Sequence, residues 1–236
     1  MTKLKGILLT EGMHGMISQV EGLAKALDIN YSHHTVETKG FWKVIPPKFT
    51  PISDSVFKKI ECEDVDLIIS CGRKSIIPSL FLKKNSKKKV FNIHIQNPKI
   101  KLDNFDLVVV PEHDNLDGDN VLKTKGAIHY LTSEEIEKDK EYLFSISSKL
   151  RDKNIISLII GGPTQYYDYS DRNIQEIFSK VNYLVKENNL NLVVIPSMRT
   201  PKGTIEHAKI YFGNDHLVLD GVCLLYTSPS PRDTEV

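Results

Sequence analysis

Short runs of apolar residues alternate with polar loops along this chain, and each run is rich in branched aliphatic side chains. Buried parallel strands have this pattern, so the runs predict strands. The five clearest runs are 67–70, 90–93, 107–110, 155–160 and 192–195. Open parallel sheets bind ligands beyond the carboxyl ends of their strands, so we expect a site in the polar loops that follow.

Segments with helical periodicity separate the predicted strands. In 16–27, for example, apolar side chains recur at the spacing of one helix face. The pattern predicts further strands at 4–10, 29–36, 121–123 and 217–219, and helices at 16–27, 53–61, 74–84, 132–150, 171–187 and 202–211. Strands that alternate with helices predict the α/β class with parallel sheets.

The predicted helix 132–150 and the polar residues 151–154 separate two series of strands. We therefore expect an N-terminal domain over 1–150 and a second domain over 151–222. A complete domain usually has about 100–150 residues, so the second domain is expected to be incomplete.

Residues 223–233 resemble the translated read-through of a sequencing adapter, a peptide found at the ends of truncated metagenomic reading frames. We therefore expect 223–236 to be a non-native tail and leave it out of the fold prediction. A natural tail rich in serine and proline is the alternative.

The composition is that of an ordinary soluble protein, with a formal net charge of +1 and 26% charged residues. It lacks the clustered basic excess of a nucleic-acid binder. No stretch approaches the roughly 20 apolar residues of a membrane span, and the first apolar run is too short for a signal peptide. Three cysteines without disulfide or metal spacing fit a reducing compartment. These features predict a cytoplasmic protein, with peripheral contact at the inner face of the membrane left open.

Two loops of the first domain have residue types that bind anions. Gly12, His14 and Gly15 lie where a strand gives way to a helix, and glycines there let the backbone approach a phosphate or sugar. A tight turn is the alternative, and the spacing is not that of a dinucleotide fingerprint. Arg73 follows the strand at 67–70 and suits bidentate contact with phosphate or carboxylate, unless it is simply solvated. Cys71 beside it is expected to pack rather than to react.

Two further loops follow consecutive strands of the same domain. One contains Gln96 and Asn97, and the other contains Glu112 and His113 followed by Asp114. Glu112 and His113 are able to deprotonate an acceptor hydroxyl. Turn and capping chemistry is the alternative, and it would explain Asp114 well. Two such clusters on consecutive strands favour a functional role.

The second series of strands has its own pair of polar loops. Residues Gly161, Gly162 and Thr164 follow the first strand, and Ser197, Arg199 and Thr200 follow the next. Close backbone approach, hydroxyl donors and a guanidinium together suit a diphosphate without a required metal. Three tyrosines at 166, 167 and 169 could stack on a base or sugar, although packing explains them as well. The lysine-rich run 83–89 could contact anionic lipid, although a solvated helix end explains it better.

Taken together, these loops resemble the family named for plant mitochondrial-fission proteins of the Elm type. The motifs that carry the resemblance occur in order, at 12–15, 71–73, 95–98, 110–114, 160–163 and 196–201. It covers essentially all of residues 1–222. Position 11 is glutamate where an aspartate is expected, and Asn97 stands where an aspartate is common.

The resemblance implies a GT-B-like architecture of two Rossmann-like domains, because bacterial members of the family are described as glycosyltransferases. It assigns the acceptor to the N-terminal domain and a nucleoside diphosphate sugar to the C-terminal domain. Gly161 and Gly162 match the loop near the donor diphosphate in the N-acetylglucosaminyltransferase that forms lipid II. The incomplete second domain would leave this chain inactive.

The first hypothesis is a glycosyltransferase that moves a sugar from a nucleoside diphosphate sugar to a lipid or glycan acceptor of the cell envelope. It would need no metal and no cofactor, with His113 or Glu112 as the base. The second is a non-catalytic adaptor on a membrane surface, as the plant relatives are named. The third is a nucleoside-diphosphate-sugar epimerase, which some older labels state. The missing dinucleotide fingerprint and Tyr-x-x-x-Lys pair speak against it.

Overall fold

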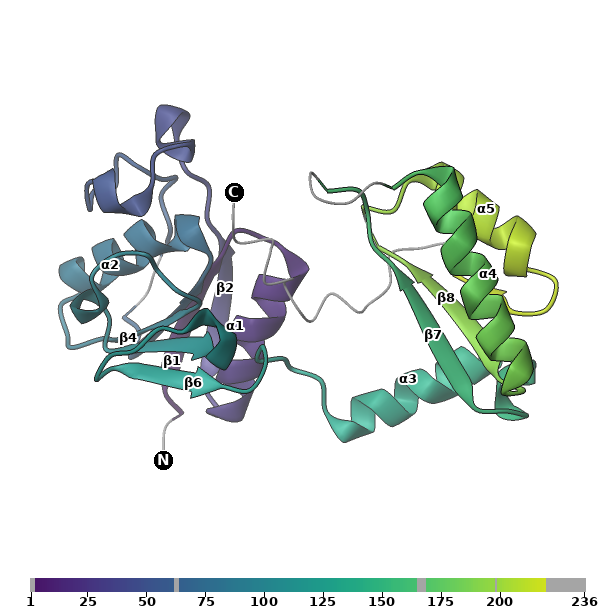
Figure 1. The fold of residues 1–236 in the computed structure, drawn as a ribbon. Helices are drawn as coiled ribbons and strands as arrows, with labels where there is room; N and C mark the ends of the chain where they lie inside the picture. Colours follow the sequence, from purple (N-terminus) through teal and green to yellow (C-terminus); the bar gives the residue numbers. More distant parts are fainter. Residues whose placement is uncertain (1–2, 62–63, 165–168, 198, 220–236) are drawn as a thin grey trace. The chain divides into compact units, whose positions relative to one another are not determined.

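The computed structural model describes residues 3–61, 64–164, 169–197 and 199–219. The chain forms two compact units that divide between Leu131 and Thr132 (Figure 1). We call them the N-terminal unit and the C-terminal unit and describe each by itself.

The N-terminal unit contains a six-stranded sheet in the order β2-β1-β3-β4-β5-β6, and every neighbouring pair is parallel. Its strands are β1 (Lys5–Thr10), β2 (Asn30–Thr35), β3 (Leu67–Cys71), β4 (Phe91–Ile95), β5 (Leu107–Pro111) and β6 (Val121–Thr124). After β2 the chain returns to the other side of β1, so the strand order reverses between β1 and β3. In open parallel sheets this reversal marks the crevice where ligands bind.

Both faces of this sheet are buried over its central strands β1, β3, β4 and β5. Successive side chains of a strand point to opposite faces, so Ile7 and Leu9 join one apolar cluster while Leu8 joins another. The helix α2 (Ile76–Asn85) contributes to the first cluster, and α1 (His14–Ala26) contributes Val20 and Ala24 to the second. Burial on both faces explains why the strands read as continuous apolar runs.

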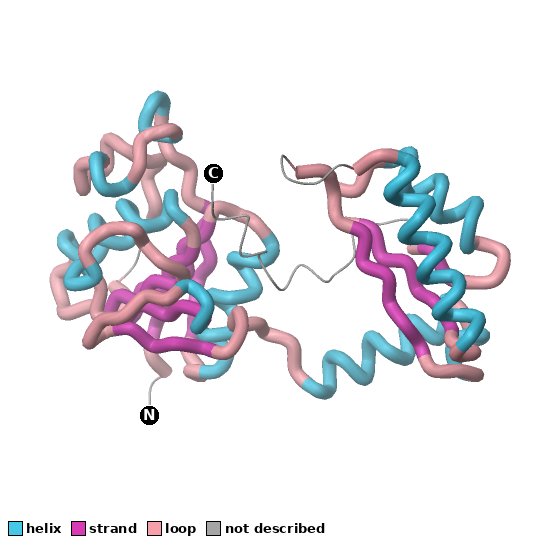
Figure 2. The backbone as a smooth tube through the Cα atoms, in the orientation of Figure 1, coloured by secondary structure: helices cyan, strands magenta, loops and turns pink. Residues whose placement is uncertain are grey.

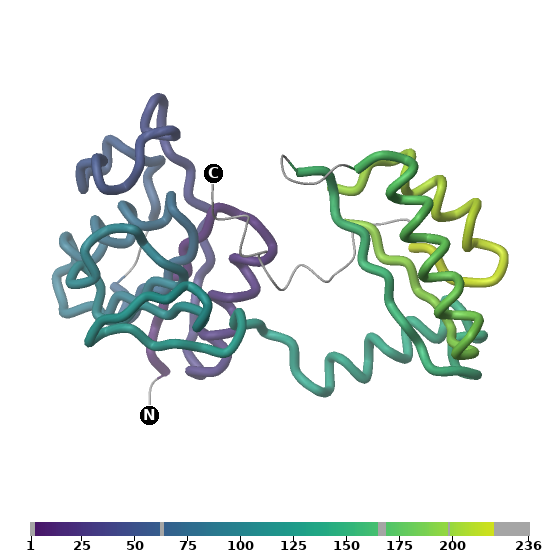
Figure 3. The backbone as a smooth tube through the Cα atoms, in the orientation of Figure 1, coloured from purple at the N-terminus to yellow at the C-terminus, as the bar shows by residue number. Residues whose placement is uncertain are grey.

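Short 3₁₀ turns occupy several of the loops. They are η1 (Gly40–Lys43), η2 (Pro47–Phe49), η3 (Arg73–Ser75), η4 (Leu102–Asn104) and η5 (Glu112–Asp114). Figure 3 follows the chain after β2 as a blue excursion that leaves the sheet and returns to β3.

The helix predicted at 53–61 is wrong. The Ser53 hydroxyl accepts a hydrogen bond from the Ser55 backbone N–H at 3.2 Å, and Thr38 and Phe57 form an isolated antiparallel bridge. Serine and aspartate side chains compete with helical hydrogen bonds in this way. The buried Val56 and Phe57 therefore anchor a loop to the apolar core and do not form one face of a helix.

The C-terminal unit is built on a three-stranded parallel sheet in the order β7-β8-β9. Its elements are α3 (Ser133–Ile146), η6 (Ser148–Arg151), β7 (Ile155–Ile160), α4 (Asp171–Glu187), β8 (Asn191–Pro196), α5 (Lys202–Phe212) and β9 (Leu217–Val218). Figure 2 shows α4 and α5 side by side along these strands, and Phe178 and Phe212 pack in the cluster they share with the sheet.

The helix α3 belongs to the C-terminal unit, although the sequence placed it in a first domain that ended at 150. Leu143 and Phe144 pack beside Val193 and Ile195 of β8, which ties the helix to that sheet. The predicted capping box at its start is confirmed. Thr132 Oγ1 accepts from the Glu135 backbone N–H at 3.2 Å, and the Thr132 N–H donates to Glu135 Oε2 at 2.9 Å.

Residues 220–236 lie outside the described part of the chain, so the non-native tail at 223–236 stays a sequence-based prediction. The same holds for the expected incompleteness of the second domain, 151–222.

The packing of α1 against the chain before Thr132 gives a test of the N-terminal unit. A Cβ atom on Gly22 would lie 2.5 Å from the His129 carbonyl oxygen, so Gly22→Ala needs a backbone shift. We expect it to lower the free energy of unfolding by about 1–3 kcal/mol, despite the better helix propensity of alanine. Urea unfolding of the chain measures the change.

Gly126→Ala is the matched control. Among the described residues, no atom lies within 4 Å of the position of its Cβ. Its unfolding free energy should stay near that of the unmodified chain. Equal stabilities of the two variants would contradict the packing of 129–130 on α1.

Candidate functional site

Glu11 joins the two loops at the reversal point of the N-terminal sheet. Its Oε1 accepts a hydrogen bond from the Lys74 backbone N–H at 2.9 Å, and its Oε2 lies 3.1 Å from Lys74 Nζ. The Glu11 side chain is only 15% exposed, so the pair is partly shielded from solvent. This interaction fixes the loop after β1 against the loop after β3.

Glycines let these two loops come so close. Gly12 has a φ of +83° and Gly72 a φ of +95°, a region that side chains disfavour. A Cβ on Gly72 would also lie 2.7 Å from Met16 Sδ and 3.0 Å from Glu11 Oε1. The Gly12 N–H donates to Thr10 Oγ1 at 3.1 Å, so this glycine has the tight-turn role that the sequence left open.

The helix α1 starts directly after this turn, with His14 and Gly15 in its first turn. Met13 occupies the N-cap position and provides no capping side chain. N–H groups at an uncapped helix start favour a negatively charged ligand. The structure therefore keeps Gly12, His14 and Gly15 together at the reversal point.

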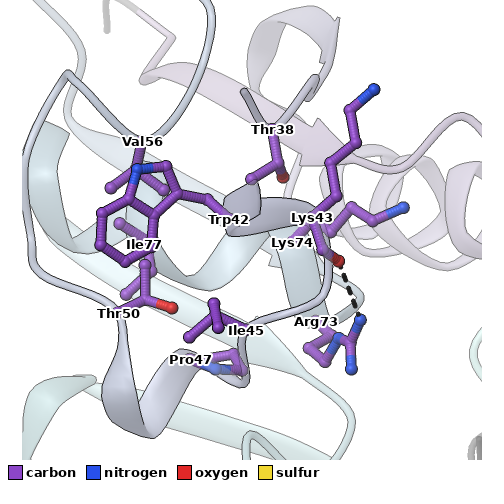
Figure 4. A pocket seen from close by; sticks show the side chains of 10 residues that line it. All are labelled: Thr38, Trp42, Lys43, Ile45, Pro47, Thr50, Val56, Arg73, Lys74 and Ile77. Atoms are coloured by element: carbon purple, nitrogen blue, oxygen red, sulfur yellow. Dashed lines mark hydrogen bonds between the residues drawn. The ribbon is translucent and has the colours of Figure 1, made fainter. Parts of the chain in front are cut away.

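Arg73 is exposed beside the same point, in η3. One of its terminal nitrogens donates to the Lys43 carbonyl at 3.4 Å, which links it to the excursion after β2 (Figure 4). A shallow hollow with a volume of ≈ 20 Å³, the space of about one water molecule, lies here. It is lined by Thr38, Trp42, Lys43, Ile45, Pro47, Thr50, Val56, Arg73, Lys74 and Ile77. Cations beside an apolar wall suit an anion that carries an apolar group.

Gln96 lies at the end of β4 in an unusual conformation. Its φ is +89°, and its N–H donates to the Val109 carbonyl at 2.8 Å, which ties the ends of β4 and β5 together. Within the described part of the chain its Nε2 is buried and has no hydrogen-bond partner. Backbone strain and a buried donor without a partner are both costly and often occur at functional sites. Asn97 instead serves the turn, because its Oδ1 accepts from the Lys99 N–H at 3.0 Å.

Glu112 and His113 are exposed in η5, at the end of β5. His113 Nε2 lies 3.7 Å from Asp114 Oδ1. β5 is three strands from β1 in the sheet order, which is roughly 14 Å at the usual strand spacing. The structure therefore puts the predicted bases on the same edge of the sheet as Glu11 but does not bring them to the reversal point.

Cys71, the last residue of β3, is fully buried in the second apolar cluster, which confirms its packing role. Burial raises the pKa of the Cys71 thiol, and the negative charge of Glu11 raises it further. A thiol that keeps its proton is a poor nucleophile.

His94 is a buried polar residue that the sequence analysis did not single out. Its Nδ1 lies 2.9 Å from the Ser70 hydroxyl, and its ring stacks on Phe105 with 5.1 Å between centroids. Burial lowers the pKa of His94 to about 3, so the ring is neutral near pH 7. Its place inside an apolar run hid it, because a histidine between isoleucines reads as part of the strand.

The loops after β7 and β8 are locked together by Thr200. Its hydroxyl lies 2.7 Å from the Ile160 carbonyl and 2.9 Å from the Gly161 carbonyl, and it accepts from the Ser197 N–H at 2.8 Å. Thr200 is only 7% exposed. It therefore positions the loops, and a direct contact of this hydroxyl with a ligand would cost these bonds.

Gly161 and Gly162 differ in their surroundings. A Cβ on Gly162 would lie 2.2 Å from the Arg199 carbonyl oxygen, so this glycine is needed for loop packing. Among the described residues, no atom lies within 4 Å of the same position on Gly161. A ligand can therefore approach the Gly161 backbone closely.

The other residues predicted to bind the sugar donor also belong to these two loops. Thr164 and Arg199 are exposed, and Ser197 Oγ accepts from the Arg199 N–H at 3.3 Å. The Tyr169 hydroxyl donates to the Gly161 carbonyl at 2.7 Å, so this tyrosine braces the loop. Tyr166 and Tyr167 lie outside the described residues.

The described residues provide neither a metal-ion cluster nor a membrane-spanning helix. They contain no cluster of three or more histidine, cysteine, aspartate or glutamate side chains placed to hold a metal ion. No helix among them is both long and apolar enough to cross a bilayer.

The low pKa of His94 gives a pH-dependent stability. The unfolded chain binds a proton at this histidine below about pH 6.5, and the folded chain does so only near pH 3. Its stabilising effect is thus complete above pH 6.5 and is lost as the pH falls toward 3, by about 1.4 kcal/mol per pH unit.

Urea unfolding between pH 7 and pH 4 tests this dependence. The slope of the unfolding free energy against pH should be smaller in His94→Gln than in the unmodified chain. The difference should be the contribution of one bound proton, about 1.4 kcal/mol per pH unit. The same slope in both proteins would show that His94 is not held neutral in the folded state.

The fold has relatives among solved structures. UDP-GlcNAc 2-epimerase from Methanocaldococcus jannaschii matches with a TM-score of 0.54 at 13% identity, over 94% of this chain and 74% of that chain. UDP-N-acetylglucosamine 2-epimerase from Rickettsia bellii gives 0.48 at 13% identity, over 94% and 70%. S. aureus MnaA, in a co-structure with UDP, gives 0.47 at 15% identity, over 96% and 70%. The first match confirms the predicted GT-B-type α/β fold with Rossmann-like parallel sheets.

Sequence comparison gives the family. A search of curated proteins finds no significant match. The profile described as "Mitochondrial fission ELM1" matches residues 14–221. This range includes every polar loop described above, apart from residues 11–13 of the first loop. The chain therefore belongs to the mitochondrial fission ELM1 family.

Proposed function

We propose that the protein binds a nucleoside diphosphate sugar and transfers the sugar to a lipid or glycan acceptor of the cell envelope. The observation that carries the proposal is the loop pair after β7 and β8. Thr200 fixes the two loops, Gly161 leaves its backbone open to a ligand, and Arg199 is exposed on the second loop. A negatively charged diphosphate needs this combination of close backbone approach and positive charge.

In this mechanism the second loop pair stabilises the leaving group. Arg199, Ser197 and the peptide groups of Gly161 and Gly162 would face the negative charge that develops on the departing diphosphate. The fold supports this assignment, because its relatives include proteins named as UDP-GlcNAc 2-epimerases. The proposed reaction uses no metal and no cofactor.

The acceptor is assigned to the N-terminal unit. Gly12, His14, Gly15 and Arg73 lie together at the reversal point, where the uncapped start of α1 favours an anionic group. His113 or Glu112 would take the proton of the acceptor hydroxyl, because both are exposed and neither is held in a buried ion pair. They lie three strands from the reversal point, so the anionic group and the reacting hydroxyl of the acceptor would be roughly 14 Å apart. Gln96, with its buried Nε2, is a further candidate for acceptor contact.

An epimerase is the second candidate, and the fold match to a UDP-GlcNAc 2-epimerase favours it. It differs from the transferase in needing no acceptor. Incubation with UDP-GlcNAc alone, followed by chromatography of the sugars, separates the two activities. A new sugar epimer formed without acceptor would favour the epimerase.

Nucleotide binding tests the proposed donor site. We expect the protein to bind a uridine, cytidine or guanosine diphosphate without added metal. Arg199→Ala should weaken that binding by about 1.5–3 kcal/mol, the range for a hydrogen bond to a charged group. Calorimetry measures it.

Arg151→Ala is the matched control. Arg151 pairs with Glu141 before β7 begins, at the other end of that strand from Gly161, so its loss should leave nucleotide affinity unchanged. His113→Ala should also spare binding but lower transfer about a hundredfold or more. Absence of binding to every common nucleoside diphosphate and its sugars would overturn the transferase and favour the adaptor.

A further inference from the structure

Exposed apolar side chains gather on the excursion between β2 and β3. Phe41 is 64% exposed, Val44 73%, Phe49 71% and Ile52 41%. They belong to η1, η2 and the residues between and after them. Exposed apolar residues scattered singly are ordinary, but a group of them on one segment indicates a surface that something covers.

This segment is held in place rather than loose. Trp42 packs against the first apolar cluster of the N-terminal unit, with its ring 4.3 Å from that of Phe41. Arg73 donates to the Lys43 carbonyl, and the Thr50 hydroxyl donates to the Pro46 carbonyl at 2.9 Å. The neighbouring Phe41, Val44 and Phe49 are therefore presented outward by a fixed backbone.

The charge around these side chains is positive. Residues 37–59 contain five lysines and two acidic residues. Lys58 pairs with Glu37, while the Lys39 ammonium donates to the backbone carbonyl of Asp54. Lys48 lies 5.8 Å from the centre of the Phe49 ring. Apolar tips with lysines beside them are typical of proteins that lie on an anionic membrane surface.

The lysine-rich run at 83–89 is a weaker candidate for the same role. Lys83 pairs with Asp106 at 2.7 Å and Lys88 with Asp66 at 2.7 Å, so two of its charges are neutralised. The run precedes β4 and so lies at the amino end of that strand, away from Gln96. The run 83–89 contains only lysine, asparagine and serine, so it adds no exposed apolar side chain that could enter a membrane.

We propose that residues 39–52 form a docking surface for an anionic phospholipid bilayer, with Phe41, Val44 and Phe49 inserted among the headgroups and Lys39, Lys43 and Lys48 facing the phosphates. The surface goes beyond the proposed transfer reaction, because it depends on no nucleotide. It would also bring Arg73 and the hollow beside it close to the headgroups, where a lipid acceptor of the sugar would lie.

Vesicle binding by the chain of residues 1–236 tests the surface. Trp42 is the only tryptophan, so its fluorescence reports on this segment alone. Vesicles of phosphatidylcholine with phosphatidylglycerol should bind the chain, and brominated acyl chains in them should quench Trp42. Vesicles of phosphatidylcholine alone should bind it less, and added salt should weaken binding to the anionic vesicles.

Two pairs of variants separate this surface from general stickiness. Phe41→Ser with Phe49→Ser should weaken vesicle binding about tenfold or more. Tyr142→Ser with Tyr183→Ser, at positions 66% and 65% exposed, should not change it. Lys43→Gln with Lys48→Gln should weaken binding about fivefold or more, whereas Lys87→Gln with Lys89→Gln should have little effect.

Circular dichroism of each variant checks its fold, and Val44→Ser replaces the phenylalanine pair if that pair unfolds. Absence of binding to anionic vesicles, or equal binding by the Phe41 and Phe49 variant, would overturn the proposal. It would also be overturned by a dimer that the same variant dissociates, since the surface would then join two copies. Calorimetry with nucleotide on the same proteins is independent of these outcomes, so a failed docking surface leaves the transferase untouched.

Discussion

A parallel sheet that is covered on both faces can expose polar chemistry only where its strands end. In the N-terminal unit the side chains of β1 alternate between two apolar clusters, and Ile68 and Ile69 of β3 do the same. Hydrogen-bonding groups within such strands are used by their neighbours. The reversal between β1 and β3 is then the place where two loops can part and admit a ligand, and the Glu11–Lys74 interaction decides how far they part.

The same constraint explains why so much of the fold could be predicted. Continuous apolar runs are required of strands buried on both faces, and β3, β5 and β8 show both the run and the burial. Prediction failed where the apolar residues belonged to a loop, as at Val56 and Phe57. The packing of α3 could not be predicted either, because the side chains that tie α3 to β8 contact residues about 50 positions later, and no local pattern reports this.

The candidate residues fall into two groups once their contacts are known. Gly12, Asn97, Gly162 and Thr200 have structural roles: a turn for the first two, a close backbone approach for Gly162, and hydrogen bonds between loops for Thr200. Sequence alone could not distinguish these roles from ligand contact, since the same residue types serve both. Gly161, Arg73 and Gln96 are different. Packing among the described residues does not explain an open glycine, an exposed guanidinium, or a residue at positive φ whose buried Nε2 has no hydrogen-bond partner among them.

The two units differ in how their strand ends carry charge, and this difference favours separate ligands. After β8, the buried Thr200 hydroxyl hydrogen-bonds to the backbone at the end of β7, and Arg199 adds a positive charge beside an open glycine. After β2, the chain instead leaves the sheet and exposes phenylalanines among lysines. A loop held by backbone hydrogen bonds and carrying one cation suits a small diphosphate, because geometry set before binding limits the entropy lost on binding. A broad apolar and basic surface suits a bilayer, which has no fixed geometry to match and rewards buried area and summed charge. The chemistry of each edge thus points to a different partner, a soluble nucleotide for one and a lipid surface for the other.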